Sequence, residues 1–138
     1  MSPDTETGVL LFAHGARDPR WALPFEAVAS HCRQARGESG PTPSRVALAF
    51  LEFMTPDLVT AGCQLADQGC RAVVVVPLFL GAGGHVRKDI PVLMAQLQAL
   101  HPQVRFALQP TVGESELVVQ AMAAMALQAA ETMDVDKA

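Results

Sequence analysis

The sequence predicts an α/β fold of three layers, doubly wound around a central four-stranded parallel sheet. Two observations lead to this fold class. Short, continuous apolar runs alternate along the chain with longer segments whose apolar residues recur at helical spacing. The runs also lack the alternation of apolar and polar residues that marks a strand with one solvent-exposed face. They are therefore typical of strands that helices cover on both sides. Strands that alternate with helices need crossover connections, which are right-handed as a general rule.

The first half of the chain predicts two strands and two helices. Residues 8–13 form an unbroken apolar run and are expected as the first strand. A helix is expected over residues 19–36, with Asp18 as its N-cap and a proline in its first position. After a loop rich in Gly, Ser and Pro at residues 37–43, the second strand is expected at 45–51.

A second helix is expected to begin at Thr55-Pro56-Asp57, which offers an N-cap and an N1 proline, and to run to about residue 68. Gly69 ends it. Residues 71–80 are rich in β-branched side chains and predict the third strand.

The last part of the chain predicts two helices around a short strand. Residues 89–100 carry an amphipathic stripe that is typical of a helix, formed by Ile90, Leu93, Met94, Leu97 and Leu100. A fourth strand is expected at 104–108, and a final helix from about Ser115. We interpret the methionines of that final helix, Met122 and Met125, as core filler.

Composition bounds the class of protein. A chain of 138 residues, half of them hydrophobic, predicts one globular domain over residues 1–138 with a core at about 8–130. The longest apolar run is too short to span a bilayer, and no signal peptide is recognisable, so we expect a cytoplasmic protein without a membrane partner. The net charge of −4 lacks the basic excess that is typical of nucleic-acid-binding proteins, so we expect no nucleic-acid partner. Three cysteines without a C-x-x-C pair are expected to be free thiols.

Three candidate site residues each follow a predicted strand. His14 closes the first strand, Glu52 follows the second, and His85 follows the third after a glycine-rich loop. In an open parallel sheet these carboxyl ends face the ligand crevice. Two imidazoles and one carboxylate are a familiar open-site ligand set for zinc, cobalt, nickel or iron, and imidazoles also move protons.

Basic side chains follow both histidines. Arg17 and Arg20 come after His14, while Arg87 and Lys88 come after His85. We interpret them as an anion-binding rim in a chain of opposite net charge. The alternative is ordinary surface charge at two helix starts.

The glycine loop at residues 81–84, which includes Gly83 and Gly84, does not match a nucleotide motif. It lacks the third glycine of a dinucleotide fingerprint and the lysine of a P-loop, so no nucleotide cofactor is expected. Its backbone can hold an anion at the following helix start, or leave room for a large flat ligand.

A second alternative is a histidine-phosphatase-like hydrolase, in which a histidine after the first strand acts as nucleophile. Such enzymes carry an arginine before the histidine, where this chain has Ala13. We therefore treat phosphatase chemistry as a minor alternative.

Four stretches of the chain together resemble a known family. They are LLFAHGARDP at 10–19, AFLE at 49–52, VVVVPLFL at 73–80 and GHVRKDIP at 84–91. This pattern is similar to the small single-domain class II chelatases, the CbiX/SirB group of sirohydrochlorin chelatases. The resemblance covers roughly residues 8–128, and the His85 block with its Asp-Ile-Pro is its most specific part. The chain departs from the family at Ala16, where serine is usual, and at residues 110–113, where Pro-Thr-Val-Gly replaces Pro-Leu-Gly.

The resemblance implies a chelatase-like fold and a lyase that inserts a divalent metal into a tetrapyrrole without ATP. The metal would be Co²⁺, or else Ni²⁺ or Fe²⁺, and the substrate sirohydrochlorin or a related ring of cobalamin or siroheme biosynthesis. The resemblance assigns metal-binding and catalytic roles to His14, His85 and Glu52. The substrate's carboxylates would pair with the basic rim, and Gly83 and Gly84 would leave room for the macrocycle.

Larger relatives carry two such halves in one chain, so we expect a homodimer with its cleft between the subunits. The other function class that stays open is a metal- or tetrapyrrole-binding protein without turnover, such as a metallochaperone.

Overall fold

Strands and helices alternate along the whole described chain, which confirms the predicted α/β class. The computed structural model describes residues 6–38, 43–81 and 83–133, and the side chain of His85 also lies outside the described part, as do residues 39–42 of the predicted loop. The elements occur in the order β1 (Thr7–Ala13), η1 (Pro19–Ala22), α2 (Leu23–Ala35), β2 (Val46–Phe50), α3 (Leu58–Asp67), β3 (Ala72–Pro77), α4 (Gly84–Leu100), β4 (Arg105–Leu108), η2 (Val112–Glu114) and α5 (Glu116–Glu131).

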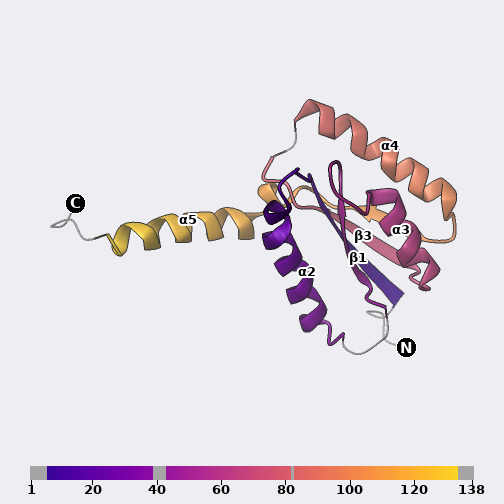
Figure 1. Ribbon diagram of the computed structural model, residues 1–138, viewed down its shortest axis with the longest axis horizontal. Coiled ribbons are helices and arrows are strands. Elements are labelled where there is room, and N and C mark those ends of the chain that lie inside the picture. Colours follow the sequence, from indigo (N-terminus) through magenta and orange to yellow (C-terminus); the bar gives the residue numbers. More distant parts are fainter. Residues whose placement is uncertain (1–5, 39–42, 82, 134–138) are drawn as a thin grey trace.

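The four strands form one parallel sheet in the order β2-β1-β3-β4. From β1 the chain leads outward to β2, and from β3 it leads outward to β4 on the other side. The connections therefore diverge between β1 and β3, and the carboxyl ends of these two strands form the switch point where ligands bind in open α/β sheets. Figure 1 shows the sheet with α3 and α4 over one face and α2 over the other.

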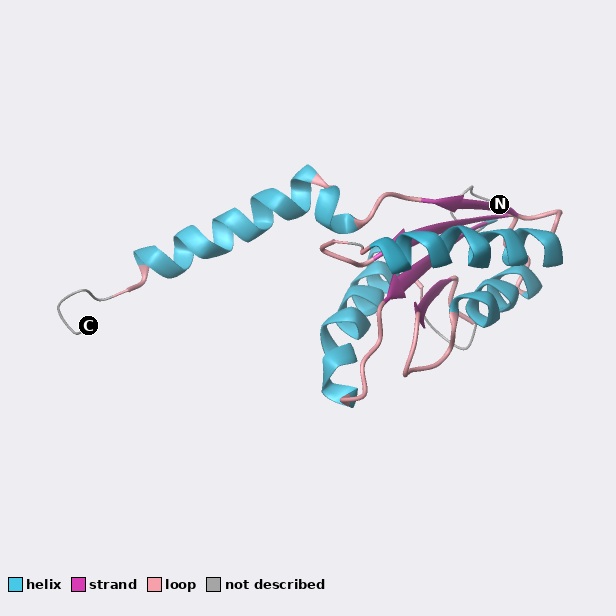
Figure 2. Cartoon of the chain, turned by 90° about the horizontal axis from the view of Figure 1, so that it is seen from above, coloured by secondary structure: helices cyan, strands magenta, loops and turns pink. Residues whose placement is uncertain are grey.

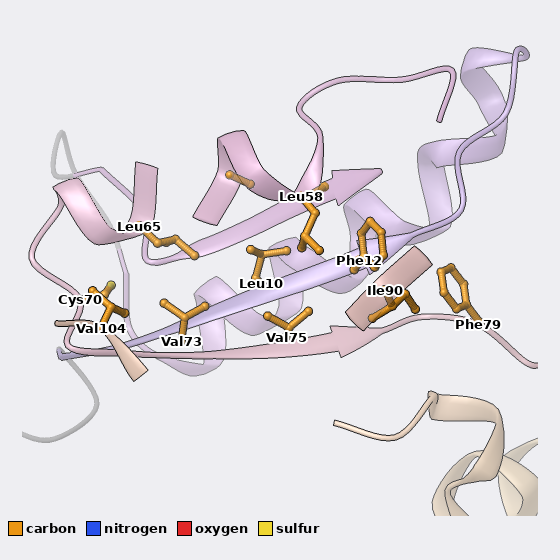
Figure 3. Packing of buried hydrophobic residues seen from close by; sticks show 12 residues of the cluster. Leu10, Phe12, Leu58, Leu65, Cys70, Val73, Val75, Phe79, Ile90 and Val104 are labelled. Atoms are coloured by element: carbon orange, nitrogen blue, oxygen red, sulfur yellow. The ribbon is translucent and has the colours of Figure 1, made fainter. Parts of the chain in front are cut away.

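The largest buried cluster lies between the sheet and the α3–α4 layer. Leu10 and Phe12 from β1 pack there with Val73 and Val75 from β3 (Figure 3). Gly62 brings α3 close to α4, because a Cβ at this position would lie 2.5 Å from the methyl carbons of Leu97. A smaller cluster lies under α2 and is formed by Leu11, Ala29 and Val46.

Three helix starts differ from the predictions. The first helix begins as the 3₁₀ turn η1, whose N-cap is Asp18 as predicted, and becomes α-helical only at Leu23. Asp57, rather than Thr55, caps α3, and its carboxylate accepts a hydrogen bond from the Thr60 N–H at 2.8 Å.

Helix α4 begins at Gly84 instead of residue 89 and contains Pro91 in its interior. Its first turn is mostly exposed, so it carries none of the apolar periodicity from which the start was predicted.

The final helix exists where it was predicted, but it does not pack against the sheet. Helix α5 extends away from the other elements (Figures 1 and 2), and none of its residues is buried. Met122 is 43% exposed and Met125 is 70% exposed. The interpretation of these methionines as core filler is therefore wrong, because amphipathic spacing indicates a face that can be buried and not the surface that buries it.

The three cysteines are free thiols, as predicted, and burial raises the pKa of the Cys70 and Cys63 thiols. Within the described ranges, no helix combines the length and apolar character that crossing a membrane requires.

Candidate functional site

His14 and Glu52 stand side by side because the ladder between β1 and β2 continues beyond both strands. The Leu51 N–H donates to the Ala13 carbonyl at 2.9 Å, and the Glu52 N–H donates to the His14 carbonyl at 3.0 Å. Gly15 then turns the chain away with φ 93°, and a Cβ there would lie 1.8 Å from the Glu52 carbonyl oxygen. The residue after His14 must therefore be glycine, since any side chain would push the two strand ends apart.

The two side chains face each other at the carboxyl edge of the sheet. The His14 Nδ1 lies 3.6 Å from the Glu52 Oε1, and both side chains are about half exposed, at 45% and 48%. Phe79, from the segment after β3, presents its ring to the His14 imidazole edge-on, with ring centroids 6.2 Å apart. An imidazole and a carboxylate at this distance, with access to solvent, form an ion pair when the imidazole is protonated, and they can bind one divalent cation together.

His85 occupies the second position of α4, in the first turn of the helix rather than in the loop before it. Its side chain is outside the described part, so its role as a ligand stays a prediction. Among the side chains that are described, no three His, Cys, Asp or Glu residues converge as a metal site. The structure brings two of the three predicted donors, His14 and Glu52, close together. Gly83 is the N-cap of α4 in extended conformation, and Gly84 is its first residue.

The basic residues after His14 have different partners. The Arg20 guanidinium forms two contacts with the Asp18 carboxylate, Nη2 to Oδ2 at 3.1 Å and Nε to Oδ1 at 3.3 Å. These contacts hold the pKa of Asp18 below its usual value. The Arg17 guanidinium instead lies over the ring of Phe53, 4.9 Å from its centroid. Arg17 is therefore beside the residue that follows Glu52, whereas Arg20 is engaged at the start of η1.

Phe53 is a site feature that the sequence analysis missed. Its φ is 66°, which is uncommon for a residue with a bulky side chain, and its side chain is 57% exposed. The backbone of Phe53 thus holds an aromatic ring in solvent directly beside Glu52. The sequence did contain a signal for Phe53. An aromatic residue just after a predicted strand end does not belong to the strand's buried apolar run, so it could have been considered as a site residue.

A cavity of about 170 Å³ opens between the carboxyl ends of β3 and β4 and the first turns of α4. Pro77, Ile90 and Leu108 contribute apolar walls, and Arg87 borders it. Lys88, the next residue, is exposed on α4. The two basic residues after His85 therefore stand at the same edge of the sheet as Arg17.

The stretch at residues 110–113 supports the segment after β3. The Gly113 N–H donates to the Phe79 carbonyl at 2.9 Å, and a Cβ at Gly113 would lie 1.7 Å from the Leu80 carbonyl oxygen. Glycine at this position lets the two backbones touch, which holds Phe79 against His14.

Comparisons with known proteins show which family the chain belongs to. The family model CbiX matches residues 8–129. The sirohydrochlorin cobaltochelatase of Sulfurisphaera tokodaii is 27% identical over 113 residues, which are 82% of this chain and 85% of that protein.

Among solved structures, a CbiX protein of cobalamin (vitamin B12) biosynthesis from Marinobacter aquaeolei is 31% identical, with a TM-score of 0.77. The match covers 92% of this chain and 99% of that one. The sirohydrochlorin chelatase SirB from Bacillus subtilis subspecies spizizenii, in complex with cobalt, is 28% identical with a TM-score of 0.66. The match covers 84% of this chain but 47% of SirB, so this chain spans about half of that protein. From the match over nearly its whole length, the chain belongs to the CbiX family.

Proposed function

We propose that this protein inserts a divalent metal, Co²⁺ in the first place, into sirohydrochlorin or a closely related tetrapyrrole. The observation that carries the proposal is the His14–Glu52 pair, 3.6 Å apart at the carboxyl edge of the sheet, in a chain of the CbiX family. The name of the archaeal relative, a cobaltochelatase, supports cobalt. Ni²⁺ and Fe²⁺ also suit imidazole and carboxylate ligands, so they are the metals to compare.

The reaction makes three demands on the site. It must take the metal out of water, pass it to four pyrrole nitrogens and accept two N–H protons. The His14 imidazole binds the incoming metal on one side and leaves the other side open to the macrocycle. Once the metal has left, the same imidazole is free to accept a proton. Glu52 then either relays that proton to solvent or offsets the charge of the metal.

His85 is the proposed second imidazole. Its position in the first turn of α4, which begins at the carboxyl edge of the sheet, supports this role. Gly83 and Gly84 precede it without side chains that would obstruct a large ring.

The peripheral carboxylates of the substrate are proposed to pair with the basic rim. Arg17 and Arg87 support this role because one lies beside Phe53 and the other borders the cavity at β3 and β4. Arg20 joins them at little cost if its exposed contact with Asp18 opens, because exposed ion pairs contribute little to stability. Lys88 is exposed and supplies a further charge.

We also propose that the protein acts in the cytoplasm as a homodimer and without a nucleotide. The chain spans about half of SirB, which supports a dimer in which two copies provide what SirB carries in one chain.

The test is an anaerobic assay with purified protein, sirohydrochlorin and Co²⁺, without ATP, that follows the absorption change on metal insertion. We expect a rate well above the uncatalysed one. His14→Ala and Glu52→Gln should each lower kcat at least about tenfold, as expected for loss of a group that transfers a proton. His85→Ala is expected to do the same. His31→Ala, at an exposed position of α2, is the matched control and should leave the rate unchanged.

Three results would count against the proposal. Stoichiometric binding of metal or tetrapyrrole with no turnover would identify a carrier instead of an enzyme. Normal rates for both His14→Ala and Glu52→Gln would remove this pair from the reaction. Hydrolysis of a generic phosphate ester that depends on His14 would favour the phosphatase alternative.

A further inference from the structure

Phe53 is an aromatic side chain held in solvent at a position whose backbone favours a different residue. Its φ of 66° lies in the left-handed region, which Gly, Asn and Asp adopt more readily than a bulky residue. The side chain is 57% exposed, so little buried apolar area offsets the strain. Strained backbone of this kind persists where the surrounding structure enforces it, and it is frequent at ligand sites.

The loop that carries Phe53 is anchored at its base and on its inner side. The Phe50 N–H donates to the Pro56 carbonyl at 2.9 Å, which closes the loop. Met54, the next residue, packs against the buried cluster that includes Ala13 and Phe50. The loop therefore turns Met54 toward the core and leaves the ring of Phe53 in solvent.

Arg17 lies over the ring of Phe53 and has unused hydrogen-bond donors. Its guanidinium is 4.9 Å from the ring centroid. Among the described side chains, no carboxylate forms an ion pair with Arg17, whereas Arg20 is paired with Asp18. A guanidinium stacked on an aromatic ring can still donate from its edge to an anion. Phe53 and Arg17 thus present an apolar surface and a cation side by side.

Exposed apolar side chains lie on both sides of His14. Phe53 follows β2 and Leu80, which is 68% exposed, follows β3, while His14 follows β1 between them. Neighbouring strands are about 5 Å apart, so β2 and β3 are separated by about 10 Å. An exposed apolar surface of this width beside a cation fits a large flat ring with anionic substituents. A metal ion or a small phosphate ester needs no such surface.

We propose that Phe53 is a substrate-binding residue on which the macrocycle stacks, and that it holds Arg17 where the guanidinium meets a carboxylate at the macrocycle's edge. Arg17 covers one face of the Phe53 ring, and the macrocycle takes the other, in an offset stack. A macrocycle stacked there lies next to Glu52 and His14, which have to receive its N–H protons. The inference deepens the proposed function and rests on it.

The first experiment measures stability and substrate affinity in the same variants. Phe53→Asn removes the ring and places at φ 66° a residue that tolerates this conformation, so its Tm should equal or exceed that of the wild type. Its Kd for metal-free sirohydrochlorin, from an absorption or fluorescence titration, should rise at least about tenfold. Phe53→Tyr keeps the aromatic face and should bind within about twofold of the wild type. A merely structural role would not weaken binding while Tm is maintained.

Leu100→Asn is the matched control. Leu100 is 59% exposed at the last position of α4, at the opposite edge of the sheet, and its substitution should leave the Kd unchanged. In the insertion assay with Co²⁺, Phe53→Asn should raise KM about tenfold and leave kcat within about twofold, because the ring holds the substrate and takes no proton. A fall in kcat with unchanged KM would overturn the assignment.

The second experiment is a double-mutant cycle between Phe53→Asn and Arg17→Gln, with the Kd for sirohydrochlorin as the readout. Each single variant should bind more weakly than the wild type. Because the ring holds the guanidinium in place, the double variant should lose less affinity than the product of the two single losses. Losses that multiply would show that Arg17 acts independently of Phe53.

The remaining outcomes separate this inference from the proposed function. If the wild type binds sirohydrochlorin and Phe53→Asn binds it equally well, the inference fails and the proposed function stands. If the wild type binds sirohydrochlorin but inserts no metal, the enzyme reaction fails, and the Kd comparison still decides the role of Phe53. If the wild type does not bind sirohydrochlorin, both fail. A change of oligomeric state in Phe53→Asn, seen by analytical ultracentrifugation, would assign the ring to a contact between copies and overturn the inference.

Discussion

Helices α4 and α5 look alike in sequence and differ in what they contact. Each follows a strand, each carries an apolar stripe, and they have 17 and 16 residues. Helix α4 buries Ile90 and Leu97 against the sheet and α3, whereas α5 buries nothing within its own chain. Amphipathic spacing therefore identifies the side of a helix that is available for packing, and the rest of the fold determines whether a surface lies within reach.

From this contrast, we expect the largest loss of stability from a substitution at Leu97, which is fully buried. Leu97→Ala should lower the free energy of unfolding by about 2–5 kcal/mol, because the side chain leaves a cavity between α3 and α4. Chemical denaturation at fixed protein concentration measures the change. A loss below about 1 kcal/mol would mean that the contact between the two helices is loose.

Gly62→Ala is expected to cause a smaller loss in the free energy of unfolding, and it tests how closely α3 and α4 pack. The new Cβ would lie 2.5 Å from the Leu97 methyls, so we expect a net loss of about 1 kcal/mol despite the better helix propensity of alanine.

In a Leu97→Ala background the same Gly62→Ala change should become neutral or stabilising, because the obstructing methyls are gone. Additive effects of the two changes in denaturation experiments would contradict the close contact.

The starts of α3 and α5 allow a third comparison. The Asp57 carboxylate accepts the Thr60 N–H, whereas Ser115 makes no side-chain capping bond. Asp57→Ala should cost about 1 kcal/mol at neutral pH, and Ser115→Ala only a few tenths.

The capping bond from the Thr60 N–H lowers the pKa of Asp57, so its stabilisation is present above the pKa of the unfolded chain. It is lost as the pH falls through the still lower folded pKa. The stability difference between wild type and Asp57→Ala should therefore shrink in acid. Parallel pH profiles for these two proteins would show that the cap is not charged.

The smallest effect is expected at Leu127 in α5. Leu127→Ala should change the free energy of unfolding by less than about 0.5 kcal/mol, because the side chain is 66% exposed on a helix with no buried residue. The same substitution made at Leu97 and Leu127 thus compares the two helices directly. A large loss at Leu127 would show that another surface covers this side of α5.

The order of strands and helices could be predicted from the sequence, and so could the edge of the sheet that carries the candidate site. Those features depend on local periodicity, which each segment displays without its neighbours. His14 and Glu52 could be placed at one edge because the carboxyl ends of parallel strands lie together. The start of α4 could not be predicted, because its mostly exposed first turn shows no helical spacing of apolar residues.

Two features could be known only from the tertiary structure: which strands are neighbours and where α5 points. The order β2-β1-β3-β4 makes β1 and β2 adjacent, and this brings the His14 and Glu52 side chains within 3.6 Å. The positive φ of Phe53 and the contact of Gly113 with the segment after β3 also depend on residues far away in sequence. Such features arise from packing between distant segments, which no window of sequence contains.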